Sequence, residues 1–235
     1  MIGTLRAVVL DAPDVRRLAA FYTALGGWSE QYADDEWIAM QTADGWRIAV
    51  QRSPDHVPPR WPDPAYPQQA HLDLRVPDLD TASARAVELG AEPLRKNEQW
   101  YTLADPAGHP FDICQRDGVG PTMGLYAVTI DAPDAIALAR FYADLLGMEV
   151  TYEGPEGALI TGDGKSVMFQ QIAEYNPPQW PDPAHPQQAH LDILVEDLDA
   201  AEARALELGA TLLKGGGKQW RTLADPAGHP FDLSL

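Results

Sequence analysis

The chain has 235 residues, 45% of them apolar, enough to bury one large core or two smaller ones. Its formal net charge of −18 excludes a nucleic-acid partner, because phosphate binding needs clustered Lys and Arg, and no apolar run reaches the roughly 18 to 20 residues of a membrane helix. The N-terminus lacks the basic-then-apolar layout of a secretory signal and the lone Cys114 has no disulfide partner, so we expect a cytoplasmic globular protein with no membrane partner.

The sequence is a tandem duplication. The stretch DAPDVRRLAAFYTALGG from Asp11 is repeated with substitutions as DAPDAIALARFYADLLG from Asp131. Further along, WPDPAYPQQAHLDL from Trp61 returns as WPDPAHPQQAHLDI from Trp180, and TLADPAGHPFD occurs once in each half. We therefore predict two domains of similar structure.

In chain order, each half reads as two similar modules. Each module begins with a short strand and an acidic helix N-cap, continues as an amphipathic helix that ends at a Leu-Gly pair, and closes with turn-punctuated strands. Proline-rich segments, expected to be stiff extended crossovers, join the modules of each half, and DGVGP joins the halves. The predicted domains are residues 1–118 and 121–235, with modules at about residues 3–53, 68–117, 123–172 and 187–235.

This order of elements resembles the vicinal oxygen chelate superfamily, which includes glyoxalase I, fosfomycin-resistance enzymes, extradiol dioxygenases and bleomycin-resistance proteins. The resemblance rests on the four βαβββ-like modules, the FY pairs late in helices, the HLDL strand and the DPAGHPFD hairpins, and it covers nearly the whole chain. It implies an α+β fold of two tandem glyoxalase-like domains, each with two paired βαβββ modules in a curled mixed sheet and helices outside. In that family two modules line a cleft, and metal-dependent members place ligands on the first and last strands of a module.

Carried onto this chain, the family's ligand positions fall on His71 and His190 in first strands and on Asp112 and Asp232 in last strands. The two odd-numbered modules have apolar residues at these positions: Ala7, Ala49, Ala127 and Met168. A cleft that joins an odd to an even module would then hold two candidate ligands, whereas catalytic zinc or iron normally has three. Only a pairing of the two even modules would gather four. No metal cofactor is favoured, and a divalent metal at His71, Asp112, His190 and Asp232 is the alternative.

Without a metal, His71 and His190 are candidate acid–base groups. Strand alternation places His71, Asp73 and Arg75 on one face, expected to line the cleft, and Asp192 follows His190 in the same way. A carboxylate beside the imidazole would raise its proton affinity and suit it to act as a general base. The alternative is a structural histidine bonded to a nearby carboxylate. Two further histidines precede a proline in hairpin turns and are interpreted as turn residues: His109 and His229.

The two domains differ at three positions expected to face the clefts. Trp37, Arg47 and Arg75 are matched by Glu156, Ser166 and Leu194. We therefore expect the cleft of the first domain to bind a flat, negatively charged ligand, with Trp37 for stacking and both arginines for the anion. The alternative is that the tryptophans are core and the arginines solvated. Gln51 and Gln170 lie on neighbouring strands and would add polar contacts.

The favoured function is metal-independent binding of a small molecule, either as a sequestering protein or as a cofactor-free enzyme with a cleft His-Asp pair as acid and base. The second interpretation is a metal-dependent glyoxalase-like lyase, isomerase or dioxygenase. The third is a structural protein whose duplication serves assembly. The chain would be a monomer of two domains or a homodimer. The sequence leaves open the substrate and which modules pair.

Overall fold

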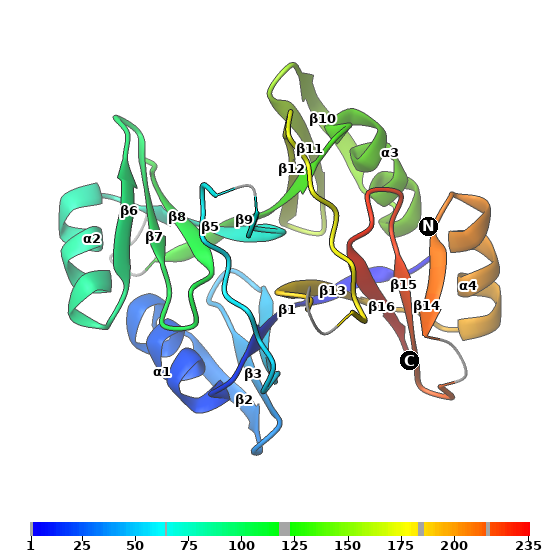
Figure 1. Ribbon diagram of the computed structural model, residues 1–235, viewed down its shortest axis with the longest axis horizontal. Coiled ribbons are helices and arrows are strands. Elements are labelled where there is room, and N and C mark those ends of the chain that lie inside the picture. Colours follow the sequence, from blue (N-terminus) through cyan, green and yellow to red (C-terminus); the bar gives the residue numbers. More distant parts are fainter. Residues whose placement is uncertain (1, 64, 118–122, 183–185, 215–216) are drawn as a thin grey trace.

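The computed structural model describes residues 2–63, 65–117, 123–182, 186–214 and 217–235, which contain sixteen strands and four helices (Figure 1). Module 1 contains β1 (Thr4–Ala12), α1 (Val15–Gly26), β2 (Ser29–Ala33), β3 (Trp37–Gln41) and β4 (Arg47–Arg52). Module 2 contains β5 (Ala70–Val76), α2 (Leu79–Glu88), β6 (Glu92–Lys96), β7 (Trp100–Ala104) and β8 (Pro110–Gln115). Module 3 contains β9 (Gly124–Ala132), α3 (Ala135–Leu146), β10 (Glu149–Gly154), β11 (Gly157–Gly162) and β12 (Lys165–Gln171). Module 4 contains β13 (Ala189–Leu194), α4 (Leu198–Glu207), β14 (Thr211–Lys214), β15 (Trp220–Ala224) and β16 (Pro230–Ser234).

The helix boundaries follow from capping. An aspartate precedes each helix, and its carboxylate accepts a hydrogen bond from a backbone N–H of the first turn, as the sequence predicts: Asp14, Asp78, Asp134 and Asp197. Left-handed glycines end the two longer helices, Gly27 with φ 66° and Gly147 with φ 67°. In α1 the left-handed residue is therefore Gly27, one residue beyond the predicted Leu-Gly pair. No helix in the described part of the chain is long and apolar enough to span a membrane.

The strands form two eight-stranded mixed sheets. Sheet 1 has the order β14-β15-β16-β13-β1-β4-β3-β2, and sheet 2 has the order β10-β11-β12-β9-β5-β8-β7-β6. Module 1 thus joins module 4 through antiparallel β1 and β13, and module 2 joins module 3 through antiparallel β5 and β9. Helices α2 and α4 lie at opposite ends of the molecule (Figure 1).

Each sheet combines an odd with an even module, as expected, but takes them from different domains. The chain passes from β8 to β9 over a short connection and stays within sheet 2. The two proline-rich segments instead carry it from β4 to β5 and from β12 to β13, which lie in different sheets. Of the predicted linker DGVGP, all but Asp117 lies outside the described residues.

Packing between modules explains two of the repeated motifs. Tyr22 of the FY pair in α1 donates from its hydroxyl to Asp105 in the DPAGH turn of module 2, at 3.0 Å, and Phe21 packs edge-on against Phe111. His109 lies 3.0 Å from the same Asp105 carboxylate through Nδ1, and its Nε2 lies 3.1 Å from a main-chain oxygen. The tyrosine, phenylalanine and Nδ1 contacts recur in the second half, where Nε2 of His229 lies 3.2 Å from the hydroxyl of Tyr175 instead. The two modules of each domain are therefore held together by a helix packed on a hairpin.

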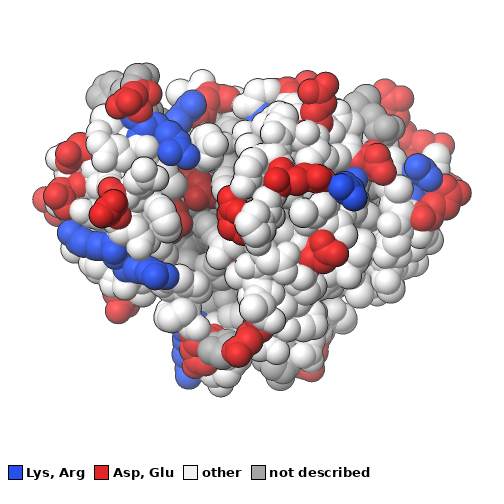
Figure 2. Space-filling view, turned by 90° about the horizontal axis from the view of Figure 1, so that it is seen from above, with Lys and Arg blue, Asp and Glu red and all other residues white. Residues whose placement is uncertain are grey.

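The two crossovers meet each other at residues with the same place in the repeat. The backbone N–H of Gln69 donates to the side chain of Gln188 at 3.1 Å, and that of Gln188 donates to the side chain of Gln69 at 2.9 Å. Each amide also donates to a proline carbonyl of the other crossover. Outside, acidic side chains are spread over the face seen in Figure 2, with Lys and Arg in a few groups.

Candidate functional site

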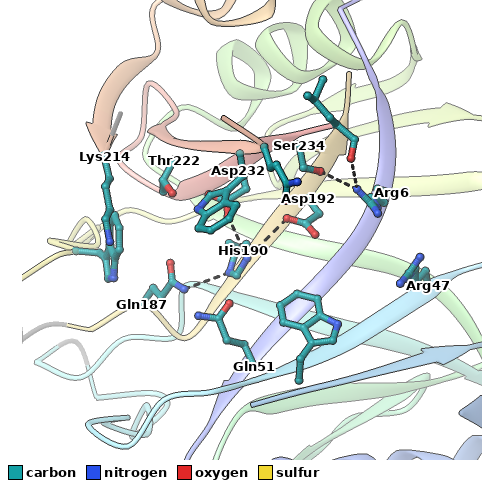
Figure 3. A pocket seen from close by; sticks show the side chains of 15 residues that line it. Arg6, Arg47, Gln51, Gln187, His190, Asp192, Lys214, Thr222, Asp232 and Ser234 are labelled. Atoms are coloured by element: carbon teal, nitrogen blue, oxygen red, sulfur yellow. Dashed lines mark hydrogen bonds and ion pairs between the residues drawn. The ribbon is translucent and has the colours of Figure 1, made fainter. Parts of the chain in front are cut away.

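A His-Asp-Asp group lies on sheet 1, at what we call cleft 1. His190 and Asp192 are two residues apart on β13, so their side chains share one face of the sheet. Asp232 on β16 is the parallel register partner of Asp192, which brings a second carboxylate to the same place. The Nε2 atom of His190 lies 3.9 Å from a carboxylate oxygen of Asp192 and 4.0 Å from one of Asp232 (Figure 3).

A pocket of about 580 Å³ opens over this group. Module 1 contributes Arg6, Trp37, Arg47 and Gln51, and the second crossover and module 4 contribute the rest of the wall, including Trp180, Gln187, Lys214 and Trp220. Trp37 packs against a small apolar cluster of Ala7, Val9 and Ala49. The pocket thus has cations on both sides, Arg6 and Arg47 from module 1 and Lys214 from module 4.

Sheet 2 carries the same His-Asp-Asp group, at what we call cleft 2. His71 on β5 lies 3.9 Å through Nε2 from Asp73 and 3.9 Å from Asp112 on β8. The neighbouring β9 differs from its sheet 1 counterpart here: the hydroxyl of Thr129 donates to Asp73 at 2.5 Å. Cys114 lies next to Asp73 and is partly buried, as a small residue filling the space should be.

Burial and charge oppose each other within these groups. Burial by itself lowers the pKa of His71, but the carboxylates of Asp73, Asp112 and Asp131 outweigh it, and the net effect raises the pKa of this histidine. Burial also raises the pKa of Asp112 and, in cleft 1, of Asp192. His71 and Asp112 in cleft 2, and Asp192 in cleft 1, therefore hold a proton more tightly than they would in water.

A hydrogen bond on the far side of each imidazole defines its tautomer. The side-chain amide nitrogen of Gln68 lies 3.2 Å from Nδ1 of His71 and donates to the carboxylate of Asp131, also at 3.2 Å. An ionised carboxylate only accepts, so the amide must turn its NH₂ group toward Asp131, and the same nitrogen then faces Nδ1. Burial raises the pKa of Asp131; while this carboxylate is ionised, Nδ1 is the acceptor and the proton of the neutral ring lies on Nε2.

The same arrangement recurs in cleft 1. The side-chain amide nitrogen of Gln187 lies 3.2 Å from Nδ1 of His190, and the Gln187 side chain hydrogen-bonds to the carboxylate of Asp11. Asp11 is 2% exposed, and one of its carboxylate oxygens has no hydrogen-bond partner within the described chain.

The predicted count of two candidate metal ligands in each cleft is wrong. Three ligand atoms, one imidazole nitrogen and two carboxylate oxygens, lie within 4.8 Å of one another at each site. Asp192 and Asp73 are the additional ligands, because strand register sets them beside Asp232 and Asp112. The two even modules lie in different sheets, so they do not combine into a four-ligand site. In number these donors suffice for a metal; the histidine tautomer does not fit one, because a protonated Nε2 has no lone pair to give.

The structure separates two arginines that the sequence analysis places in one cleft. Arg47 lines cleft 1, whereas Arg75 lies on sheet 2, because module 1 pairs with module 4. The guanidinium of Arg75 contacts the carboxylate of Asp44 at 2.7 Å, in the turn between β3 and β4. Gln170 is exposed on β12 of sheet 2, away from its counterpart Gln51 in cleft 1.

Sequence reasoning missed Arg6, which supplies the second arginine of the pocket. Strict alternation puts Arg6 opposite Ala7 and so away from the cleft. A register shift between Leu5 and Ala7, however, leaves Arg6 as the extra residue of a bulge. Its guanidinium donates to the hydroxyl of Ser234 at 3.2 Å and to the main-chain oxygen of Leu235 at 3.0 Å, at the rim of the pocket (Figure 3). No local sequence signal marks this bulge.

Comparison with known proteins bears on the whole chain. Residues 7–114 and 127–234 each match the glyoxalase-like domain family. The chain belongs to this family. The glyoxalase-like protein is similar in structure to glyoxalase I from Zea mays, with a TM-score of 0.65 and 16% identity over 98% of this chain and 92% of that one. It is also similar to a putative dioxygenase from Bacillus subtilis, with a TM-score of 0.62 and 11% identity over 99% of this chain and 85% of that one.

These likenesses confirm the predicted α+β fold of the glyoxalase-like protein and its tandem repeat. At such low identity they show the fold only, and function must be argued from the site. A search of curated protein sequences found no significant match.

Proposed function

We propose that cleft 1 binds a small molecule that carries a flat apolar part and a negative charge, and that it does so without a metal. The observation that carries this proposal is the pair of arginines in the pocket. Arg6 and Arg47 both line the cavity of a chain whose net charge is −18, and the charge of both already acts on the Asp192 carboxylate in the same pocket. Two guanidinium groups at a cavity wall can bind an anionic ligand through charge-assisted hydrogen bonds.

The remaining wall suits the rest of such a ligand. Three tryptophans line the cavity: Trp37, Trp180 and Trp220. The Trp37 side chain packs against the apolar cluster described above. A cavity of about 580 Å³ is within the usual range for small-molecule sites. The ligand's flat part would lie against the tryptophans and its anion near the arginines.

The histidine would meet the polar end of the ligand. The Nε2 atom of His190 lies 3.9 and 4.0 Å from its two carboxylates, too far for a hydrogen bond, so its N–H is available to a ligand atom in the pocket. Because its Nε2 already carries a proton, His190 would act on the ligand as a hydrogen-bond donor, and Asp192, whose pKa burial raises, would take the proton of an acidic O–H or C–H group. Cleft 2 has the same group in His71 and its carboxylates.

A second candidate is a metal-dependent lyase, isomerase or dioxygenase. One observation favours it, namely that each cleft gathers a histidine and two aspartates within 4.8 Å. We place it second because of the tautomer described above.

Ligand titration distinguishes these functions. Tryptophan fluorescence is followed while aromatic carboxylates and aromatic phosphates are added, with and without a chelator. We expect saturable binding that Arg47→Ser weakens about 10- to 100-fold, because a charge-assisted hydrogen bond contributes about 1.5–3 kcal/mol. Serine is the residue at the matching position Ser166, so the reverse change, Ser166→Arg, is the matched control and should leave cleft 1 unchanged.

Two outcomes would overturn the proposal. The first is that Arg47→Ser binds every ligand as tightly as the wild type. The second is that binding requires a metal, shown by loss of signal with the chelator and by a metal content that disappears in His190→Ala. That second result would establish the metal-dependent candidate.

A further inference from the structure

We propose that Gln187 and Gln68 are positioning residues, oriented by the buried carboxylates of Asp11 and Asp131, that hold the cleft histidines with their proton on Nε2 and thereby keep metal out of sites that have enough ligands. The inference deepens the proposed metal-free function and rests on it. It explains why a His-Asp-Asp group can act as a hydrogen-bonding site.

The direction of the hydrogen bonds carries the argument. Metal-bound histidines commonly donate their other N–H to a carboxylate or carbonyl, which leaves a lone pair for the metal. Here the partner of Nδ1 is an amide nitrogen in both clefts, at 3.2 Å each. A donor at Nδ1 selects the opposite tautomer, so Nε2 carries hydrogen and points at the carboxylates.

The amides are not free to turn over. Gln68 and Gln187 are 6% exposed, so water does not compensate for a lost partner. Turning either amide would set its oxygen against the carboxylate of Asp131 or Asp11, two acceptors facing each other in a buried place. The two orienting carboxylates lie on β9 and β1, whereas the grouped candidate metal ligands lie on β5, β8, β13 and β16.

The orientation rests on one residue type, and this makes it testable. An asparagine in place of Asp131 can present its own NH₂ group to the Gln68 oxygen. The Gln68 amide could then turn over and accept from Nδ1–H of His71, and Nε2 would gain a lone pair. The variant Asp131→Asn should therefore alter cleft 2, and Asp11→Asn should alter cleft 1.

The first measurement is the tautomer of the wild-type histidines, from long-range ¹H–¹⁵N NMR spectra at a pH where the rings are neutral and without any ligand or metal. We expect the Nε2–H pattern for His71 and His190. In Asp131→Asn the His71 pattern should shift toward Nδ1–H while His190 stays unchanged, and Asp11→Asn should do the reverse. Each variant thus serves as the control for the other.

The second measurement is titration with Zn²⁺ and with Mn²⁺ by calorimetry. Each Asp→Asn variant should bind metal at least about tenfold more tightly than the wild type, at one site, since changing the groups that hydrogen-bond to a metal-ligating histidine commonly alters metal affinity by 10–100-fold. Adding His71→Ala to Asp131→Asn should abolish that gain. If Asp131→Asn does not fold, Gln68→Met replaces it. This variant removes the amide that donates to Nδ1, so the His71 proton should no longer be confined to Nε2.

An Nδ1–H pattern in the wild type would overturn the inference, as would an affinity for metal that the Asp→Asn variants leave unchanged. Neither result depends on ligand binding in cleft 1, since the spectra are recorded without ligand. If the wild-type histidines show the Nε2–H pattern but the ligand titrations show no binding, the proposed function is overturned and this inference stands.

Discussion

The sharpest prediction on stability concerns His56, which stands in the first crossover where the second has Tyr175. Its Nε2 lies 3.0 Å from the main-chain oxygen of Ala107, and its ring centroid is 4.9 Å from that of His109. The other ring nitrogen is buried and has no hydrogen-bond partner in the described part of the chain. Burial and, to a smaller extent, the neighbouring His109 lower the pKa of His56 to about 4. We predict that His56→Tyr makes the protein more resistant to acid.

The size of the effect follows from linkage. An unfolded histidine has a pKa of about 6.5, so His56 takes up its proton in the unfolded chain before it does so in the folded one. Above pH 6.5 the ring is neutral in both the folded and the unfolded chain, so it does not affect the free energy of unfolding. That free energy decreases as the pH falls from 6.5 toward 4, because only the unfolded chain binds the proton. A difference of about 2.5 pH units corresponds to about 3.4 kcal/mol, and partial solvent screening of the half-buried ring reduces this to about 2–3 kcal/mol.

The assay is urea unfolding of the wild type and His56→Tyr at pH 8 and pH 4.5. Between these two pH values the wild type should lose about 2 kcal/mol more than the variant. Titration of the buried aspartates is common to both proteins and cancels in the difference. The tyrosine has a precedent in Tyr175, whose hydroxyl donates to the main-chain oxygen of Ala227 at 2.8 Å. An equal loss of stability in both proteins would refute this reasoning.

Three further predictions concern contacts that hold the modules together, each measured by denaturant unfolding. Tyr22→Phe should destabilise by about 1.5–3 kcal/mol, because the buried Asp105 carboxylate loses a donor; a smaller loss would show that His109 satisfies this carboxylate by itself. Gln69→Ala and Gln188→Ala should have costs that add in the double variant, since each removes two hydrogen bonds to the other crossover's backbone and leaves the other two in place; a double-variant loss well below the sum would contradict this. Gly108→Ala should destabilise by about 2 kcal/mol or more, because φ is +94° and the added Cβ would lie 2.5 Å from a proline of the first crossover; a neutral result would mean that the turn relaxes.

Local features of the fold were readable in the sequence because their causes are local. An aspartate just before an amphipathic helical segment can cap the helix whatever the tertiary structure, and each predicted N-cap accepts its hydrogen bond. Alternation along β5 and β13 likewise sets His71 with Asp73, and His190 with Asp192, on a shared face. The duplicated motifs identified both domains and the resemblance to the family.

The composition of each cleft depended on contacts far apart in the chain. The third candidate ligand came from the parallel register of Asp192 with Asp232, and Arg6 entered cleft 1 through a bulge. Arg75, expected beside Arg47, lies on the other sheet and contacts Asp44. Each of these outcomes follows from strand pairing, which local patterns do not specify.

The pairing itself was hidden by the duplication. Strand β1 had two nearly identical candidate neighbours, AHLDL at the start of β5 and AHLDI in β13, and it pairs with β13. Equal side-chain patterns offer β1 nearly equal contacts, so residues on the strands do not distinguish the two arrangements. The choice rests on how the whole chain packs: the short passage from β8 to β9, the long crossovers that meet at Gln69 and Gln188, and the helix of each odd module seated on the hairpin of the next. The modules and their polar motifs follow from local sequence patterns, whereas long-range packing sets which modules share a cleft.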